Sequence, residues 1–553
     1  MKTLCDVLRQ SAERNPDAPA VGWTRASGGG GFTYRELHGA MRTGAEALRR
    51  ADLRPGDKVL LHLDARPEWA AALFAILEAG AVAVPIPAET PPEIVARAAA
   101  FANARAAILG ERTQRAAAGL RAVRCIDVER LVRPTEPENG IGECPSTSPT
   151  TTDPGQSGTG DLRARDDDNA LAILAFTSGS TDQPRAVELT HANILADLRG
   201  LLALREARPG DAFLSMLPPA HLFETTAGLL GPIACGARVV YPGSILPNRL
   251  ADALREEHIT HALCVPALLD ALHAEVVDGL VESGHADAAR RGQSTAETAR
   301  RIREELTRED LGKLRDVARA RVGGSLHTLI VGGAAIDPAW TEIALALEVR
   351  LEVGYGLTEA GPVVSMGLAA ECPAGSVGRP LPGISVRVDA HREIQVRGAN
   401  VTRGYHRNPA ATAAAFDDGW LRTGDRGHLD ANGFLFVTGR IKEAMVAANG
   451  ETVYPEEAEA YYGSPLFSEF CVAGLRGPNG NDVPALFAVP ASPDVRQEAL
   501  REAYENLRAL APPRFRVQRF VRLDQPLPRT ATGKVRRRTL AAACGAKLQV
   551  SET

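Results

Sequence analysis

The sequence predicts an α/β protein in which a large N-terminal domain of doubly wound sheets plus a small barrel is joined to a smaller α+β C-terminal domain. Three observations predict this class. Short apolar runs alternate with helical patterns over most of the chain, which favours parallel sheets covered by helices. Apolar and polar residues then alternate over 377–404, which is typical of antiparallel strands. Beyond Arg440, strand and helix patterns mix without regular alternation.

The beginning of the chain shows the alternation of helices and strands most clearly. Thr33 and Glu36 have the spacing of a capping box, which predicts the start of a helix that continues to Arg50. Gly80 follows an apolar helical pattern and is expected to end that helix. The elements expected here are helices over 4–12, 33–50, 67–79 and 92–103 and strands over 58–63, 81–86 and 106–109.

The segment 134–168 interrupts this alternation. It is rich in Thr, Ser, Pro, Gly and charged residues and contains few large apolar residues. Such a composition buries too little apolar surface to offset the entropy cost of ordering the chain. We therefore predict that 134–168 is a disordered insertion. The N-terminal domain that contains it is expected to span 1–439.

In the second half of the large domain, two neighbouring strands run into glycines. The apolar run 326–331 leads into Gly332 and Gly333, and the run 348–353 leads into Gly354, Tyr355 and Gly356. Ligands of open parallel sheets bind outside such strand ends, and glycine lets a flat ring approach the backbone. Other elements expected here are strands over 171–176, 212–217, 237–241 and 262–265 and helices over 191–204 and 225–233.

The segment 274–321 is a charged and mostly helical excursion. A charged helical segment without a candidate catalytic group is typical of a solvated face. We therefore expect surface helices there that take no part in a functional site.

The C-terminal part of the chain is expected to form a separate α+β domain that spans 440–553. Its size, roughly one hundred residues, is that of an independent folding unit. The boundary is expected near 440–442. The elements expected in and just before this domain are a hairpin strand over 433–439, helices over 455–462 and 495–510, and strands over 470–475, 485–489 and 517–523.

Composition and charge exclude several classes of protein. The 553 residues include 63 basic and 68 acidic side chains, so the net charge of −5 provides no electrostatic reason to expect nucleic acid as a partner. The eight cysteines are scattered without a Cys-x-x-Cys pair, which argues against a zinc site and fits reduced thiols in a cytoplasmic protein. No apolar run is long enough to span a membrane, although peripheral membrane contact stays open.

A candidate phosphate-binding loop follows the apolar run 171–176. Its small and mostly hydroxylated residues, together with free backbone N–H groups, form a donor surface that suits phosphate oxygens. The loop is not a Walker A loop, and a plain turn between two strands is the alternative reading. The residues are Thr177, Ser178, Gly179, Ser180 and Thr181.

Four later stretches give this loop a context. They are YGLTE at 355–359, TGDRG at 423–427, GRIK at 439–442 and PRTATGK at 528–534. In this order and at these spacings the chain resembles the adenylate-forming (AMP-binding) superfamily. The resemblance extends from about Thr33 to Arg538. It is closest to the long-chain fatty acyl-CoA synthetases, on the evidence of PPAHLFE at 218–224, LIVGGAAIDP at 329–338 and ANVTRGYHRNP at 399–409.

The resemblance implies ATP-dependent activation of a fatty acid to acyl-AMP. The acyl group would then pass to CoA, and the products would be acyl-CoA, AMP and pyrophosphate. It also implies Mg²⁺ as a cofactor. ATP, CoA and the fatty acid would be the small-molecule partners.

The resemblance also implies a nucleotide site built from several segments. The loop 177–181 and Arg185 would hold pyrophosphate, and Asp425 would accept hydrogen bonds from the ribose hydroxyls. Arg440 would lie near the ribose or phosphate. The residues that would flank adenine are Gly332, Gly333, Ala334, Tyr355 and Gly356.

The catalytic residues that the resemblance implies are Lys534, Thr358, Glu359 and His221. Lys534 would bridge the substrate carboxylate and the α-phosphate, Thr358 would contact the α-phosphate, and Glu359 would hold Mg²⁺. Lys442 would be the hinge about which a mobile C-terminal domain swings, bringing 448–450 towards the thiol. Each of these functional assignments has a purely structural alternative. Asp425 could be a turn residue and Glu359 a surface carboxylate. Lys534 could belong to a solvated basic tail, and Lys442 could form an ion pair between the domains.

The phosphate loop departs from the pattern of the family it resembles. Where the family usually reads Thr-Gly-x-Pro-Lys-Gly, this chain has Thr181, Asp182, Gln183, Pro184, Arg185 and Ala186. Asp182 places a carboxylate where the loop would fold over phosphates. Arg185 keeps the positive charge in a different shape.

Two alternatives stay open beside the fatty acid–CoA ligase, and the departures at Asp182, Arg185 and Ala186 bear on the second of them. One is a fatty acyl-AMP ligase that loads an acyl carrier protein. The other is a catalytically weakened nucleotide- or acyl-binding protein. Pyrophosphate release measured with and without CoA separates the three.

Overall fold

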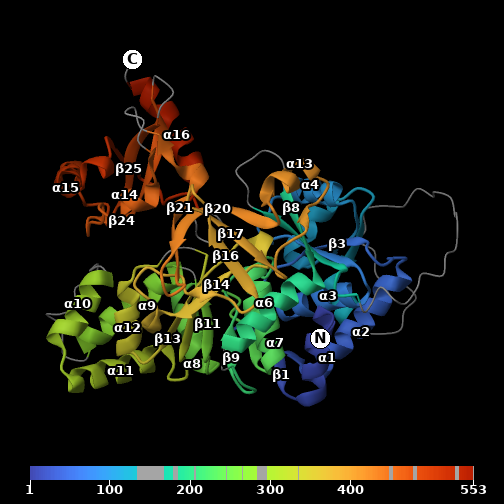
Figure 1. Cartoon of the computed structure of the whole chain (residues 1–553). Coiled ribbons are helices and arrows are strands. Elements are labelled where there is room, and N and C mark those ends of the chain that lie inside the picture. The colour runs from blue at the N-terminus through green and yellow to red at the C-terminus, as the bar shows by residue number, and fades with distance from the viewer. Residues whose placement is uncertain are drawn as a thin grey trace.

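The computed structural model describes most of the chain. It covers residues 1–133, 167–177, 185–204, 207–244, 246–264, 266–282, 295–333, 336–446, 452–477, 482–529 and 535–551. The predicted α/β class is confirmed, with two largely parallel sheets, an antiparallel sheet and a smaller C-terminal unit (Figure 1). Residues 134–166 of the predicted insertion lie outside the described residues.

The first sheet has seven strands among the residues described. Its centre is parallel, and β8 and β18 are antiparallel strands at one edge. Its central strands are covered on both faces, which explains their continuous apolar runs. In spatial order the strands are β18 (Gly404–Tyr405), β8 (Arg185–Thr190), β7 (Leu171–Thr177), β4 (Val82–Pro85), β3 (Lys58–His62), β5 (Ala104–Leu109) and β6 (Arg124–Asp127).

The second sheet has nine strands in the described part of the chain. Six of them, from β13 to β1, are parallel, and the remaining strands pair antiparallel at the two edges. In spatial order the strands are β15 (Arg379–Pro380), β14 (Ser365–Leu368), β13 (Arg350–Tyr355), β12 (Thr328–Val331), β11 (His261–Cys264), β9 (Ala212–Leu214), β10 (Arg238–Tyr241), β1 (Pro19–Trp23) and β2 (Gly31–Thr33).

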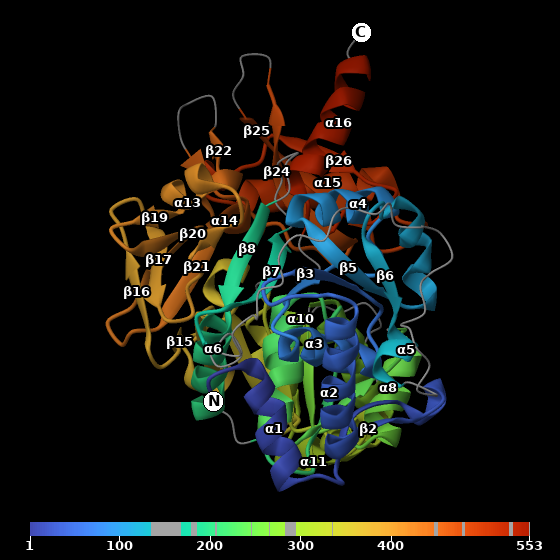
Figure 2. The same ribbon diagram turned by 90° about the vertical axis from the view of Figure 1, so that its right-hand side faces the viewer.

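A layer of helices packs between these sheets. Side chains of α1, α2 and α3 share one apolar cluster with strands of both sheets, and Figure 2 shows these helices beneath β3 and β5. The predicted capping box is present at the start of α2, where the Thr33 hydroxyl accepts from the Glu36 N–H and Glu36 accepts from the Thr33 N–H. The layer also contains α6. The bounds are α1 (Leu4–Arg14), α2 (Tyr34–Arg50), α3 (Pro67–Glu78) and α6 (His191–Leu204).

The outer faces of both sheets are covered by further helices, which include those of the charged segment 274–321. The helices of 274–321 are not merely solvated, because Val276, Leu280, Ile302 and Leu314 are buried against the second sheet. An apolar stripe at helical spacing lies among their charges. No helix within the described ranges is both long and apolar enough to cross a bilayer. The bounds are α4 (Pro92–Ala102), α5 (Val128–Val132), α8 (Pro247–Glu256), α9 (Pro266–Glu282), α10 (Thr295–Glu305), α11 (Arg308–Val322) and α12 (Ala339–Ala346).

The predicted helix 225–233 has an unusual geometry. Glu224–Leu230 is a π-helix, η4, which is buried throughout and leads into α7 (Gly231–Cys235). The π-turn is a rare geometry that concentrates at functional sites. The strand expected over 212–217 ends earlier, at Leu214.

The antiparallel unit that follows is a five-stranded sheet, and the C-terminal unit lies beyond it (Figure 1). In the described part of the C-terminal unit, a three-stranded sheet and a two-stranded sheet are accompanied by helices. The elements of the antiparallel unit are β16 (Ile384–Val388), β17 (Glu393–Gly398), α13 (Pro409–Ala415), β19 (Phe416–Asp417), β20 (Trp420–Leu429) and β21 (Leu435–Arg440). The elements of the C-terminal unit are β22 (Met445–Val446), β23 (Thr452–Val453), α14 (Pro455–Glu459), β24 (Phe467–Arg476), β25 (Asp482–Pro490), α15 (Gln497–Leu510), β26 (Arg519–Arg522) and α16 (Arg537–Ser551).

Candidate functional site

The predicted phosphate loop connects two paired strands. Thr177 ends β7 and is the register partner of Arg185, which begins β8, so both residues stand at the base of the loop 178–184. The predicted residues Ser178, Gly179, Ser180 and Thr181 lie outside the described residues.

The two predicted glycine-bearing strand ends lie side by side. β12 and β13 are parallel and pair Val331 with Val353, so the residues after both strands stand at the same edge of the sheet. A Cβ on Gly332 would lie 3.1 Å from the Phe223 ring, which explains why a side chain is disfavoured there. Gly333 has φ +86°, a conformation that glycine adopts without strain. The predicted Ala334 lies outside the described residues.

Tyr355, at the end of β13, contacts a carboxylate from another sheet. Its hydroxyl donates a 2.7 Å hydrogen bond to Asp425 Oδ2, and Arg440 Nε lies 3.2 Å from Asp425 Oδ1. Asp425 is 5% exposed. Burial and the adjacent Asp425 charge hold the pKa of Tyr355 well above its usual value. The structure therefore brings three predicted nucleotide-binding residues together.

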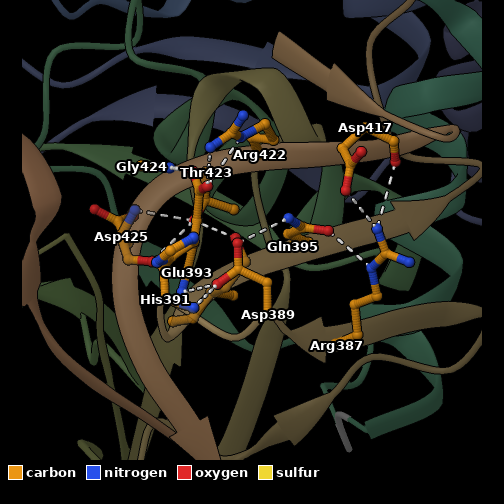
Figure 3. Close-up of polar contacts among 11 residues, drawn as sticks. Arg387, Asp389, His391, Glu393, Gln395, Asp417, Arg422, Thr423, Gly424 and Asp425 are labelled. Carbon is orange, nitrogen blue, oxygen red and sulfur yellow. Dashed lines mark hydrogen bonds and ion pairs between the residues drawn. The ribbon is translucent and has the colours of Figure 1, made fainter.

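The turn that carries Asp425 is held by Glu393, which sequence reasoning did not single out. The buried Glu393 carboxylate accepts from the Gly424 N–H at 3.0 Å and from Arg422 at 2.9 Å (Figure 3). The Thr423 hydroxyl accepts from the Asp425 N–H at 3.0 Å. Gly424 has φ +71°, so glycine suits the turn. The alternation of apolar and polar residues along β17 places Glu393 on the face opposite to Ile394 and Val396, so its burial could not be predicted from the sequence.

The predicted metal ligand Glu359 has a partner from β18. Tyr405 donates a 2.9 Å hydrogen bond to Glu359 Oε1, and the Arg185 guanidinium carbon lies 5.9 Å from the centre of the Tyr405 ring. Burial and the Glu359 charge raise the pKa of Tyr405, so its hydroxyl stays a donor. Thr358 begins the short 3₁₀ turn η6 (Thr358–Ala360) that carries Glu359. The base of the phosphate loop and the predicted metal ligand therefore share Tyr405 as a neighbour.

The turn that holds Glu359 is supported from beneath by buried polar groups. Asn400 Nδ2 donates to the Ala360 carbonyl at 2.8 Å, and the Thr402 N–H donates to the Glu359 carbonyl at 2.9 Å. The Asp197 carboxylate accepts from the Val363 N–H at 2.6 Å. Asp197 is fully buried, and burial raises its pKa well above the usual range. These contacts fix the backbone from Glu359 to Val363.

His221 and Glu224 stand at the start of the π-helix. The buried Nε2 of His221 has no hydrogen-bond partner within the described residues, and burial lowers the pKa of this histidine. Both oxygens of Glu224 are also buried without a partner that meets hydrogen-bond geometry among those residues. Burial raises the pKa of Glu224 to about 8, although Ser215 and the Leu217 backbone oppose the shift. At neutral pH the imidazole is therefore uncharged and the carboxyl protonated.

The predicted hinge is tied to the C-terminal unit. Lys442 is an exposed residue of η8 (Ile441–Glu443), and its carbonyl accepts a 2.6 Å hydrogen bond from Arg538. Across the connection, Arg426 on β20 pairs with Glu457 on α14 at 2.7 Å. The predicted Lys534 and the segment 448–450 lie outside the described residues.

Comparisons with known proteins agree with this architecture. A family model described as AMP-binding enzyme matches residues 8–406. A long-chain-fatty-acid–CoA ligase of Mycobacterium bovis is 29% identical over 80% of this chain and 75% of its own length. A feruloyl-CoA synthase of an Amycolatopsis species is 28% identical over 95% of both chains. The o-succinylbenzoate CoA synthetase of Bacillus subtilis in complex with ATP and magnesium has a TM-score of 0.73 at 22% identity, over 97% of this chain and 98% of its own.

Proposed function

We propose that this chain, which belongs to the AMP-binding enzyme family and is an acid–thiol ligase, uses ATP to activate a fatty acid and then transfers the acyl group to CoA. The observation that carries the proposal is the clustering of Tyr355, Asp425 and Arg440 beside the turn that holds Glu359. Asp425 would bind the ribose and Glu359 the metal ion, near the carboxyl ends of the parallel strands, where ligands of such sheets bind.

The proposed chemistry has two steps that balance without another reactant. A carboxylate oxygen of the acid attacks the α-phosphorus of ATP, and pyrophosphate leaves with the electrons of the broken P–O bond. The thiolate sulfur of CoA then attacks the acyl carbon, and AMP leaves from it. Catalysis of the first step is mostly positioning and charge neutralisation, so fixed donors and cations are the groups that this chain must supply.

Glu359 is chemically suited to hold Mg²⁺. Carboxylate oxygen is a hard ligand, and Tyr405 bonds to only one of the two oxygens, at 2.9 Å. When bound, Mg²⁺ would neutralise phosphate charge. Tyr405 orients the carboxylate, and Arg185, at the end of the phosphate loop, contributes positive charge on the same side. Thr177 and the loop residues 178–181 would supply donors to pyrophosphate, and Thr358 would face the α-phosphate.

Asp425 and the strand-end glycines are suited to a nucleoside. A carboxylate accepts two hydrogen bonds, and the pair of ribose hydroxyls offers two donors. Tyr355 and Arg440 hold the carboxylate in place at 2.7 and 3.2 Å. A Cβ on Gly333 would meet nothing within 4 Å, so this glycine would leave room for the adenine ring beside Tyr355, and Gly332, Ala334 and Gly356 would line the same position.

We place the acyl chain along the π-helix. Phe223 packs against Gly332, so this region adjoins the proposed adenine position, and the apolar residues of η4 are buried. His221 precedes the helix, and because burial lowers the pKa of its imidazole, an uncharged ring would face the substrate carboxylate. Each buried methylene of a fatty acid would contribute about 0.8 kcal/mol. No aspartate stands in 218–224 to pair with an amino group, which disfavours an amino acid substrate.

We further propose that 440–553 is a mobile domain that pivots at Lys442. Lys534 would complete the adenylating arrangement, and 448–450 would approach the thiol after the pivot. A connection of few residues can absorb such a change. None of the seven cysteines in the described part of the chain forms a disulfide, which supports a reducing cytoplasmic location.

The experiment that tests the proposal follows pyrophosphate release with ATP, Mg²⁺ and a panel of fatty acids, with ferulate as the aromatic comparison. Multiple turnovers that require CoA, together with acyl-CoA detected by mass spectrometry, are the expected result. Acyl-AMP that accumulates despite CoA and disappears with an acyl carrier protein would favour the carrier-loading alternative. Nucleotide binding without pyrophosphate release from any acid would overturn the proposed activity.

A further inference from the structure

Three metal-ligating side chains gather at the edge of the second sheet that is opposite to the proposed active site. Asp211 immediately precedes β9, His261 begins β11 and His327 immediately precedes the first residue of β12. These strands are parallel neighbours, and His261 is the register partner of Phe213 on one side and Thr328 on the other. The topology thus brings together residues that are far apart in sequence.

The three side chains are close enough to share one ion. One imidazole nitrogen of each histidine and one carboxylate oxygen of Asp211 all lie within 4.8 Å of one another. His327 Nε2 lies 3.8 Å from Asp211 Oδ1. Ligand atoms of a tetrahedral zinc ion lie about 3.3 Å apart, so closure needs a small movement. The His327 side chain is 47% exposed and has room to make it.

Both imidazoles are oriented by a threonine hydroxyl. His261 Nδ1 lies 2.9 Å from Thr260 Oγ1, and His327 Nδ1 lies 3.0 Å from Thr328 Oγ1. When each Nδ1–H donates to its hydroxyl, each Nε2 keeps a lone pair, which is how metal-ligating histidines are usually held. The Thr260 hydroxyl is itself fixed because it accepts from the Ala212 N–H at 2.9 Å.

The remaining contacts also favour a preformed site. The His261 ring stacks on Phe213, with ring centres 4.2 Å apart and planes 7° apart. Asp211 Oδ2 accepts from the Arg208 N–H at 2.7 Å, and its other oxygen, Oδ1, is the one that faces His327. His261 is therefore held by a ring on β9, and Asp211 by the backbone of the turn that precedes β9.

We propose that Asp211, His261 and His327 form a binding site for a divalent transition metal, with Zn²⁺ as the fitting ion. Two imidazoles and one carboxylate are ligands that zinc accepts, with a remaining position for water, whereas Mg²⁺ prefers oxygen ligands. The ion would link the amino ends of β9, β11 and β12. The site goes beyond the proposed ligase function and stabilises the sheet from the edge away from Gly332 and Gly333.

The test uses the full chain without an affinity tag, stripped of metal with a chelator and dialysed against zinc chloride in millimolar Mg²⁺. We expect about one zinc per wild-type chain and a higher melting temperature with zinc. His327→Ala and Asp211→Asn should weaken zinc binding at least tenfold and abolish the rise in melting temperature. Asp211→Asn keeps an oxygen for the Arg208 N–H, which limits damage to the fold.

The matched control is His391→Ala, which removes an exposed histidine from the turn between β16 and β17. It should bind zinc as the wild type does. The proposal is overturned if the wild type binds no zinc at micromolar concentrations, or if all three variants bind it equally. Adenylation by the zinc-free chain should be unchanged, which keeps the outcome separate from that of the proposed ligase activity.

Discussion

Tyr355 at the end of β13 donates a 2.7 Å hydrogen bond to Asp425 on β20, which joins the nine-stranded sheet to the five-stranded antiparallel sheet. Arg440, the last residue of β21, lies 3.2 Å from the same carboxylate. The residue after Arg440 begins the 3₁₀ turn that contains Lys442. Arg440 therefore connects the proposed ribose anchor, Asp425, to the proposed pivot of the C-terminal domain, which lies two residues later at Lys442.

Replacement of Tyr355 by Phe tests whether this hydrogen bond serves nucleotide binding. A bond to a buried carboxylate contributes about 1.5 kcal/mol, so the KM for ATP should rise about tenfold. The kcat should change less, because the hydroxyl touches no reacting atom. Tyr461→Phe, which alters a tyrosine that is 39% exposed, is the control in steady-state kinetics. A fall in kcat at unchanged KM would contradict the assignment.

Glu359→Gln tests the proposed metal ligand. The amide retains the shape and an acceptor for Tyr405 but loses the charge that holds Mg²⁺. Adenylation should fall by a factor of about 100 or more, and half-maximal activity should require more Mg²⁺. The exposed Glu371, on the next 3₁₀ turn, provides the control Glu371→Gln. An unchanged Mg²⁺ dependence of the Glu359 variant would assign the carboxylate a structural role only.

Lys534→Ala tests the residue that would bridge the two reactants. Loss of a cation at the reacting centre should raise the barrier of adenylation by roughly 2.7–4 kcal/mol, by analogy with a lost oxyanion donor. Thioester formation from supplied acyl-AMP should be spared, because the proposed pivot removes Lys534 before that step. Arg536→Ala, which removes an exposed cation two residues away, is the control. Equal loss in both half-reactions would remove the assignment.

Lys442→Pro tests the proposed pivot. Proline fixes φ and should slow the CoA step more than adenylation, because in the proposed mechanism only the CoA step would require the domain to move. Lys442→Ala removes the ammonium group but leaves the backbone free, so it should behave like the wild type. Single-turnover measurements of each half-reaction distinguish the two. Equal slowing of both steps by proline would mean that the domain does not turn at this residue.

The parts of the site that could be predicted from sequence lie within short segments. Tyr355 and Glu359 share one motif, and the glycines after β12 belong to a continuous apolar pattern. Tyr405 and Glu393 could not be found this way, because each acts on a residue more than thirty positions away through tertiary packing. The helices of 274–321 illustrate the same limit. Their charges dominate the composition, while the burial of Leu280 and Leu314 depends on the sheet beneath them.

The carboxyl of Glu224 should make the stability of the protein fall as the pH rises. Burial raises its folded pKa to about 8 from an ordinary value of 4.5. Between these values the unfolded chain is ionised and the folded chain keeps its proton, so unfolding releases a proton and is favoured by higher pH. The loss of stability between pH 5 and pH 8 is on the order of 3 kcal/mol.

Glu224→Gln removes this titration at nearly constant side-chain volume. From pH 5 to pH 8 the wild type should therefore lose free energy of unfolding that the variant keeps, so the variant gains stability relative to the wild type. Urea unfolding midpoints at the two pH values measure that shift, with Glu371→Gln as an exposed comparison that should show none. Subtracting the wild type cancels other titrating groups such as His191, whose pKa burial lowers to about 4 and whose contribution has the opposite sign. A variant that follows the wild type at both pH values would mean that Glu224 is ionised in the folded protein, and its carboxylate would then need a cationic partner beside the π-helix.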